Sequence, residues 1–444
     1  MITRLWLRQF KAFEHCDIEL RRLTVLLGEN NSGKSSLLAA LRLMAQTVQS
    51  QDQTVPLTLS GVFGDFGSYR DLVHGNHRGR PIKIGLVCTG RNSQTPEQSY
   101  FLETEFKYRM QRRETVLRSS QLGYVEGDRQ RSLLHVTTSK DSQRLLVESV
   151  RGESIPEPAR PTLSRGLKMF NFLPRGVLDF YTNESKSPDV NRGRLLIRDS
   201  SAQTTRAFNA ILWNLRSVEY VGAMRLPPER TYVNSGVSGR KIGADGSGWP
   251  SVLALEPPRR RPVRAIIGKW MREAGIAESV SVSWLTDRHY EIVVTNPSTG
   301  ETENIADVGQ GTSQVLPVIV GAARLGRGDI FIVEEPEIHL HPRAQAALGD
   351  FFADLTGRGV QSLVETHSEY LLLRLQQKIA SGELDPAAVV FYYVYSDRGA
   401  KTVTKLTLDE NASFGDQLVG GFFPQRIEEA RKLVQARGKR PTAT

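Results

Sequence analysis

The chain has only two cysteines, Cys16 and Cys88, in 444 residues. Neither stands at the spacing of a metal site or a redox pair, which excludes a disulfide-built scaffold and favours a reducing, cytoplasmic environment. The sequence also lacks any apolar run close to the ~18 residues of a transmembrane helix, so no membrane span is expected. Its start, MITRLWLRQF, has no apolar signal core and predicts a strand.

Hydrophobic residues make up 39% of the chain, which predicts a packed globular protein. The net charge is +10, and residues 91–302 hold nearly all of it, with 32 Lys and Arg against 23 Asp and Glu. Basic clusters stand at 109–113, 129–131, 192–198 and 259–264. This segment has no sustained heptads, so we expect a compact α/β unit with helices at 204–215 and 263–274 and strands at 280–284 and 290–295. Its surface either binds nucleic acid or is merely solvated; the sequence favours neither.

One stretch, LTVLLGENNSGKSSLL at 23–38, dominates the N-terminal part. An apolar strand leads into a glycine-bounded loop and then a helix, which is the context that G-x-x-x-x-G-K-[ST] requires. Small residues let backbone N–H groups surround phosphates at a helix N-terminus, where Lys34 reaches the β- and γ-phosphates and Ser35 binds Mg²⁺. The predicted phosphate-binding residues are Gly28, Asn30, Asn31, Ser32, Gly33, Lys34, Ser35 and Ser36.

A second strand signal, DIFIVEEPEIHLHP at 329–342, ends in two carboxylates, Glu334 and Glu335. Acids at the carboxyl end of a buried parallel strand lie where α/β sheets bind ligands. One of them can hold Mg²⁺ and the other can orient an attacking water. Zinc bound by Glu337, His339 and His341 is disfavoured by their short spacing.

Two weaker signals flank that strand. Gly309, Gly311 and Ser313 precede an apolar helix from about residue 314, where they form either a phosphate-binding surface or an ordinary cap. His367 follows an apolar strand in LVETHS, a place that suits a histidine hydrogen-bonded to a γ-phosphate.

Taken in order, LRQFKAF, the phosphate loop, GQGTS, EPEIHLHP and LVETHS resemble the motifs of ABC-type ATPases of the RecF, SMC and OLD group. The resemblance implies an α/β fold: an ATPase head whose halves, 1–90 and 303–410, flank a basic insertion at 91–302, with an extension at 411–444. Gln9 departs from the usual Asn of the first motif. Arg8 and Lys11 either approach the nucleotide or lie on a solvated strand edge. No glutamine can be assigned to the family's magnesium-contacting position, Gln46 being only a guess.

The resemblance also implies the roles of the site residues. ATP would lie between two heads, with Gly309, Gly311 and Ser313 facing the partner's γ-phosphate and His341 in a dimer-facing loop. Glu334 takes the place usually filled by Asp and would hold Mg²⁺ with Ser35. Catalysis would depend on Glu335, Lys34 and His367.

The 77 residues after His367 contain no acidic metal cluster of an OLD-type nuclease. We therefore expect an ATPase that dimerises around ATP and acts as sensor or scaffold for a separate effector, a nuclease for example, as in antiphage systems of the Septu or PARIS kind. The alternatives are a RecF-like DNA-repair ATPase, a non-hydrolysing ATP-gated scaffold and a transporter ATPase subunit. The expected partners are a second copy, the effector and nucleic acid, without a membrane.

Overall fold

The computed structural model describes residues 1–90, 98–139, 144–177, 185–236, 241–255, 263–415 and 432. Its centre is a six-stranded sheet in the order β14-β19-β20-β3-β21-β22, in which only β22 runs antiparallel to its neighbour. The strands are β14 (Val218–Val221), β19 (Ile330–Glu334), β20 (Gln361–Glu365), β3 (Leu23–Gly28), β21 (Val389–Asp397) and β22 (Ala400–Leu406).

This sheet is buried along β14, β19, β20, β3 and the first half of β21, as is typical of parallel strands that are covered on both faces, whereas the edge strand β22 is partly exposed. In β3, Leu26 belongs to the core under α1 (Lys34–Gln49), whereas Val25 and Leu27 belong to the opposite core. That second core contains α7 (Gln310–Ala323), α8 (Pro342–Gly357) and α9 (Glu369–Ala380). The architecture is thus α/β, as predicted, and the predicted helices and strands of this part match within a few residues.

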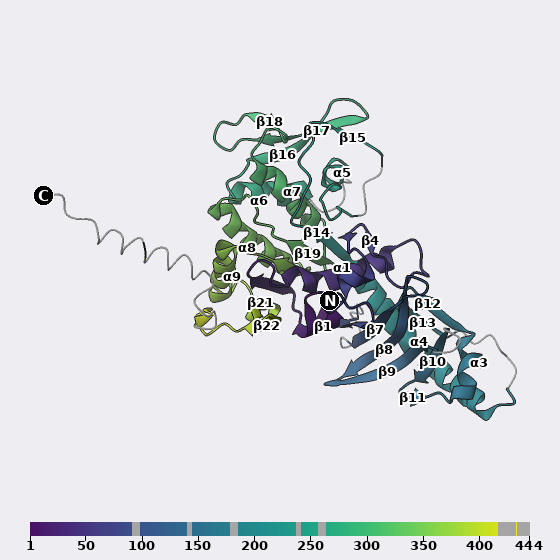
Figure 1. Cartoon of the computed structure of the whole chain (residues 1–444). Coiled ribbons are helices and arrows are strands. Elements are labelled where there is room, and N and C mark those ends of the chain that lie inside the picture. The colour runs from purple at the N-terminus through teal and green to yellow at the C-terminus, as the bar shows by residue number, and fades with distance from the viewer. Residues whose placement is uncertain are drawn as a thin grey trace.

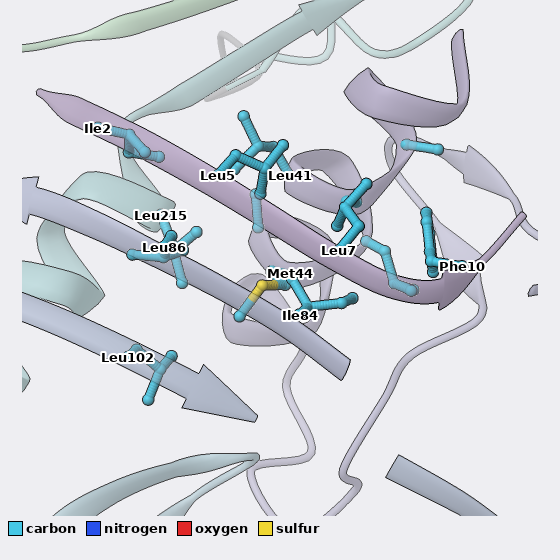
Figure 2. Close-up of a cluster of buried hydrophobic side chains, with 14 of the residues drawn as sticks. Ile2, Leu5, Leu7, Phe10, Leu41, Met44, Ile84, Leu86, Leu102 and Leu215 are labelled. Atoms are coloured by element: carbon cyan, nitrogen blue, oxygen red, sulfur yellow. The ribbon is translucent and has the colours of Figure 1, made fainter. Parts of the chain in front are cut away.

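A second, antiparallel sheet of eight strands lies on the α1 side, in the order β11-β10-β9-β8-β7-β6-β1-β2. Figure 2 shows how its strands meet α1: side chains of β1 and β6 gather around Leu41 and Met44. Its strands are β1 (Ile2–Phe10), β2 (Phe13–Glu19), β6 (Ile82–Thr89), β7 (Ser99–Arg109), β8 (Glu114–Glu126), β9 (Arg129–Thr138), β10 (Leu145–Val150) and β11 (Glu153–Ser154).

This sheet continues through the boundary expected at residues 90 and 91, because β6 pairs with β7 over its whole length. The segment at 91–302 therefore begins as an extension of the N-terminal sheet. The division into 1–90, 91–302, 303–410 and 411–444 stays a prediction, and residues 416–431 and 433–444 of the last part lie outside the described residues.

One long helix, α4 (Pro188–Arg216), packs on β7 to β10 and projects with them to one side of the molecule (Figure 1). It begins well before the helix predicted at 204–215. Ser187 caps it by accepting a hydrogen bond from the backbone N–H of Val190, and Pro188 occupies the first helical position, where a missing N–H costs nothing. The short elements beside it are α3 (Arg160–Ser164), β12 (Leu167–Phe170) and β13 (Leu173–Val177).

The insertion also supplies β14 to the central sheet. The strands that follow it, from residue 232 on, form a small sheet on the other side of the central sheet, near α7 (Figure 1). The helix at 263–273 and the two longer strands of this region lie where the sequence predicted them, whereas the short helix at 249–254 was not predicted. This region contains β15 (Tyr232–Val233), α5 (Trp249–Ala254), α6 (Val263–Glu273), β16 (Ser279–Trp284), β17 (His289–Thr295) and β18 (Thr302–Asn304). Between α1 and β6 lie β4 (Ser60–Gly61), β5 (Gly64–Asp65) and α2 (Tyr69–Leu72).

Candidate nucleotide-binding site

The loop between β3 and α1 has positive φ angles, a backbone conformation that favours glycine. Gly28, Asn31 and Gly33 have φ angles of 141°, 61° and 109°. A Cβ on Gly28 would lie 2.0 Å from the carbonyl oxygen of Val394 in β21, so no larger residue fits there. From β22, the Lys401 ammonium donates to the carbonyl oxygen of Asn31 at 2.7 Å. The last two strands of the sheet therefore support the loop from one side.

Lys34 is 3% exposed and lies inside this loop. Its Nζ donates to the carbonyl oxygens of Gly28 at 3.0 Å and Glu29 at 2.8 Å. Burial lowers its pKa, and nearby carboxylates, Glu365 foremost, oppose that shift. Close by, the buried Ser32 hydroxyl has no hydrogen-bond partner. An ammonium and a hydroxyl held this way fit a phosphate group, which would replace the loop carbonyls as the partner of Lys34.

Glu365, the last residue of β20, contacts the phosphate loop directly. Its Oε1 accepts a hydrogen bond from the Ser35 hydroxyl at 3.0 Å and lies 3.9 Å from the Lys34 ammonium. Burial, helped by the charge of Glu334, raises its pKa to about 7. The sequence analysis did not select Glu365. Its signal was the one used for Glu334, an acid at the carboxyl end of an apolar strand.

Glu334 is engaged in an ion pair with Arg42 of α1, at 2.7 Å between Oε1 and Nη1. Arg42 also donates to the carbonyl oxygen of Phe63 at 2.7 Å, and its guanidinium carbon lies 3.8 Å from the ring centroid of Tyr220. Burial raises the pKa of Glu334, and the Arg42 charge opposes this. Arg42 is a second residue that the sequence analysis missed, because nothing in a helical arginine reveals its partner.

Glu335 follows β19 in the left-handed region, with φ 44°, and its N–H donates to the carbonyl oxygen of Glu365 at 2.8 Å. This turn is held by Arg225, whose Nη2 donates to the carbonyl oxygens of Glu334 at 2.8 Å and Glu335 at 3.0 Å. Its Nη1 reaches the carbonyl oxygen of Gln314 in α7 at 3.1 Å. Burial lowers the pKa of Arg225 to about 10, so it remains charged at neutral pH. Arg225 is the third residue that the sequence analysis missed.

His367 lies beside the same group of charges. Its backbone N–H donates to Oε1 of the buried Glu337 at 2.5 Å, which fixes the loop after β20. Burial and then the charge of Lys34 lower the pKa of its ring, so the neutral imidazole predominates at pH 7. Glu337 thus has a structural partner within the chain.

The GQGTS segment forms the start of α7. Gly309 caps the helix and is exposed, while Ser313 is only 4% exposed and its hydroxyl donates to the carbonyl oxygen of Gln310 at 3.1 Å. A Cβ on Gly311 would lie 2.6 Å from the carbonyl oxygen of His339, so the helix start packs against the EPEIHLHP loop of its own chain. His341 is exposed at the start of α8. Their contact with a second chain stays a prediction.

Other candidates lie around this centre. Asn30 and Asn31 are exposed on the loop, and Ser36 is half-buried at the start of α1. Arg8 is exposed on β1, whereas burial lowers the pKa of Lys11, with the Arg42 charge as the next cause. Gln46 is buried, and its amide binds the carbonyl oxygen of Thr58 and the N–H of Phe63. That amide holds the segment after α1, so the guess that Gln46 contacts magnesium is not supported.

The donor set fits Mg²⁺ better than a transition metal. In the described ranges, no group of three or more His, Cys, Asp or Glu side chains is arranged to hold a metal ion. Mg²⁺ needs no such cage, because it keeps several waters and uses one or two carboxylates together with substrate phosphates. The Ser35 hydroxyl and the neighbouring carboxylates provide the hard oxygen donors for it.

A glycine-bounded loop between a buried parallel strand and a helix, with a buried lysine and carboxylates from neighbouring strands, defines a P-loop ATPase domain. Residues 1–107 match a family model described as "AAA ATPase domain", and residues 217–374 match one described as "AAA domain, putative AbiEii toxin, Type IV TA system". The two matches contain all the motifs of the site, and residues 108–216 lie between them.

Among solved structures, the chain is similar to the SMC head domain from Thermotoga maritima, with 11% identity over 92% of this chain and 99% of that one, and a TM-score of 0.38. It is also similar to the Smc head domain with an extended coiled coil bound to the C-terminal domain of ScpA, from Pyrococcus furiosus, with 11% identity, 99% of each chain and a TM-score of 0.39. No curated protein matches the chain. Within the described residues, no helix is long and apolar enough to cross a membrane.

Proposed function

We propose that this protein binds and hydrolyses ATP with Mg²⁺, and that ATP joins two copies of it. One observation supports this most: Lys34, Ser35, Glu335, Glu365 and His367, from three separate segments, meet at the carboxyl ends of neighbouring parallel strands. Parallel sheets bind their ligands at that edge.

Each residue has a distinct role in the proposed reaction. Lys34 exchanges the carbonyl oxygens of its own loop for the β- and γ-phosphates, and the loop N–H groups bind the remaining phosphate oxygens. The Glu335 carboxylate orients the attacking water and accepts its proton. The His367 ring donates a hydrogen bond to the γ-phosphate. Bound Mg²⁺ would neutralise part of the phosphate charge.

The proposal of an ATP-linked dimer follows from the exposed residues beside the site in a single chain. Gly309 and His341 are exposed at the two helix starts beside the site, and Arg225 connects α7 to the turn that holds Glu335. A phosphate from a partner's nucleotide at the start of α7 would therefore act on a helix that is tied to the catalytic turn.

The test is phosphate release from ATP by the purified chain, together with its mass in solution with and without nucleotide. Glu335→Gln should bind ATP, stop hydrolysis and accumulate a dimer, whereas Lys34→Ala should lose binding itself. Glu303→Gln, an exposed carboxylate of β18, is the matched control and should behave as wild type. Hydrolysis by Glu335→Gln at the wild-type rate would disprove the assigned base, and ATP binding without hydrolysis by the wild type would indicate a non-hydrolysing scaffold.

We further propose that the ATP cycle controls a separate effector, a nuclease for example, in antiphage defence. The support is chemical: Glu365 contacts the phosphate loop, Glu334 pairs with α1, and no His, Cys, Asp or Glu side chains form an independent metal cluster in the described residues. The purified chain with ATP, Mg²⁺ or Mn²⁺ and plasmid or transfer RNA should not cleave nucleic acid until a neighbouring gene product is added. Cleavage by the chain alone that persists in Lys34→Ala would contradict this.

Nucleic-acid binding is a second candidate function, as in a RecF-like DNA-repair ATPase. A surface hollow of about 640 Å³ is lined by Arg70, Arg78 and Arg80 together with Met110 of the basic cluster at 109–113. Its arginines are exposed and can meet phosphates. The other basic clusters support this less, because Arg131, Arg192 and Arg198 pair with acids, and residues 259–262 lie outside the described part.

A further inference from the structure

The carboxylate that is hydrogen-bonded to the expected magnesium-binding hydroxyl of Ser35 does not belong to Glu334 or Glu335. Glu365, at the end of β20, accepts the hydrogen bond of the Ser35 hydroxyl at 3.0 Å. The order of the strands explains why, since β20 lies between β19 and β3 and therefore adjoins the phosphate loop. Its side chain reaches Ser35 directly.

Glu334, in contrast, already forms an ion pair with Arg42. Its Oε1 forms the 2.7 Å ion pair with Arg42, and Arg42 is itself fixed by the carbonyl oxygen of Phe63 and by the face of Tyr220. The ion pair fixes the Glu334 carboxylate at this guanidinium, which the Phe63 carbonyl and the Tyr220 ring hold in place, so a movement of Glu334 toward Ser35 that separates the pair is costly. Breaking a buried ion pair of this kind costs several kcal/mol.

We propose that Glu365, with Ser35, is the protein carboxylate that holds Mg²⁺ at this site, directly or through one water, and that Glu334 stays paired with Arg42. The inference rests on the proposed function and deepens it, because it reassigns the metal-binding role within the same site. Glu365 is then a metal-binding residue at the end of the strand that His367 follows.

Two features of Glu365 support this role. It is only 4% exposed, and its Oε2 is buried without a hydrogen-bond partner, so the carboxylate has an unused acceptor. Its nearest cation is the Lys34 ammonium at 3.9 Å, which the phosphates would draw toward themselves. A divalent cation next to Ser35 would restore the balance of charge around a buried carboxylate.

The experiment uses the full chain with AMP-PNP and measures two affinities: that of Mn²⁺ in the ternary complex, by electron paramagnetic resonance, and that of the nucleotide in EDTA. Glu365→Gln should weaken Mn²⁺ binding about 10- to 100-fold, the range found when metal-supporting residues are changed. Metal-free nucleotide should bind as well as to wild type or more tightly, because a negative charge near the phosphates is gone. A merely structural role for Glu365 would weaken both affinities together.

Glu334→Gln is the matched comparison and should lose less Mn²⁺ affinity than Glu365→Gln. Should Glu365→Gln not fold, as judged by circular dichroism, Glu365→Asp replaces it and should show a partial loss. Wild-type Mn²⁺ affinity in the Glu365 variant, parallel weakening of both its affinities, or an equal or larger loss of Mn²⁺ affinity in Glu334→Gln would overturn the inference. A wild-type chain that binds no nucleotide would instead refute the proposed function itself.

Discussion

Replacing Arg225 by lysine should destabilise the protein far more than a conservative exchange normally does. The guanidinium is 7% exposed and donates to four backbone carbonyl oxygens, those of Gly222 at 3.0 Å, Gln314 at 3.1 Å, Glu334 at 2.8 Å and Glu335 at 3.0 Å. These carbonyls belong to three separate segments of the chain. A single ammonium cannot occupy the places of three guanidinium nitrogens at once.

The expected loss of stability follows from the number of carbonyl oxygens that lose their hydrogen-bond donor. If the ammonium keeps the two carbonyl oxygens at the end of β19, those of Gly222 and Gln314 lose their donor. Each buried acceptor left without a partner costs about 1–3 kcal/mol. We therefore expect the free energy of unfolding to fall by about 2–6 kcal/mol in Arg225→Lys. Because the Glu335 turn and α7 would also lose their common donor, hydrolysis should decrease as well.

The assay is urea unfolding followed by circular dichroism, with the midpoint and the slope both fitted. The matched control is Arg230→Lys, the same exchange at an exposed arginine that binds the two oxygens of Asp307 at 2.6 and 2.8 Å. An exposed pair of this kind contributes about 0.2–1 kcal/mol. Equal losses in the two variants, or a loss below 1 kcal/mol in Arg225→Lys, would refute the reasoning.

Three further predictions follow from single residues. Gly311→Ala should lower the free energy of unfolding by about 1–3 kcal/mol, because its Cβ would lie 2.6 Å from a backbone oxygen, whereas Gly309→Ala, with no atom within 4 Å, should not. Burial raises the pKa of Glu365 from 4.5 to about 7, so the folded protein holds a proton that the unfolded chain has lost, and stability falls as the pH rises from 5 to 8. The melting temperature of Glu365→Gln should therefore exceed that of the wild type by a margin that grows over this range. A constant margin would count against the raised pKa. If the hollow binds duplex DNA, the slope of log affinity against log salt concentration should become shallower by about 0.9 for each phosphate that is no longer neutralised in Arg70→Ala, Arg78→Ala or Arg80→Ala. Arg192→Ala is the control and should keep the wild-type slope. An affinity that does not change with salt would exclude this site.

Local sequence determined the elements that carry the site. The phosphate loop needs glycine where φ is positive, a strand before it and a helix after it, and all of these requirements are met within 23–38. The run at 330–334, IFIVE, is apolar enough to predict a buried strand by itself. The run at 361–365, QSLVE, is equally buried although only Leu363 and Val364 are apolar, so its burial depends on its place between β19 and β3. Local sequence did not predict the start of α4, which begins at Pro188 and not at residue 204. The N-terminal half of this helix is polar, and it is helical because it is capped and packs on a sheet that the sequence does not reveal.

Which charges meet was decided by the tertiary structure alone. The order of strands put β20 beside β3, and so Glu365 rather than Glu334 reaches Ser35. Arg42 is remote in sequence from Glu334, and Arg225 is remote from the carbonyl groups of Gln314, Glu334 and Glu335, so no spacing rule could select these contacts. Sequence patterns report the period and burial of one element at a time, whereas the partner of a buried charge depends on how several elements pack, and that information exists only in the folded chain.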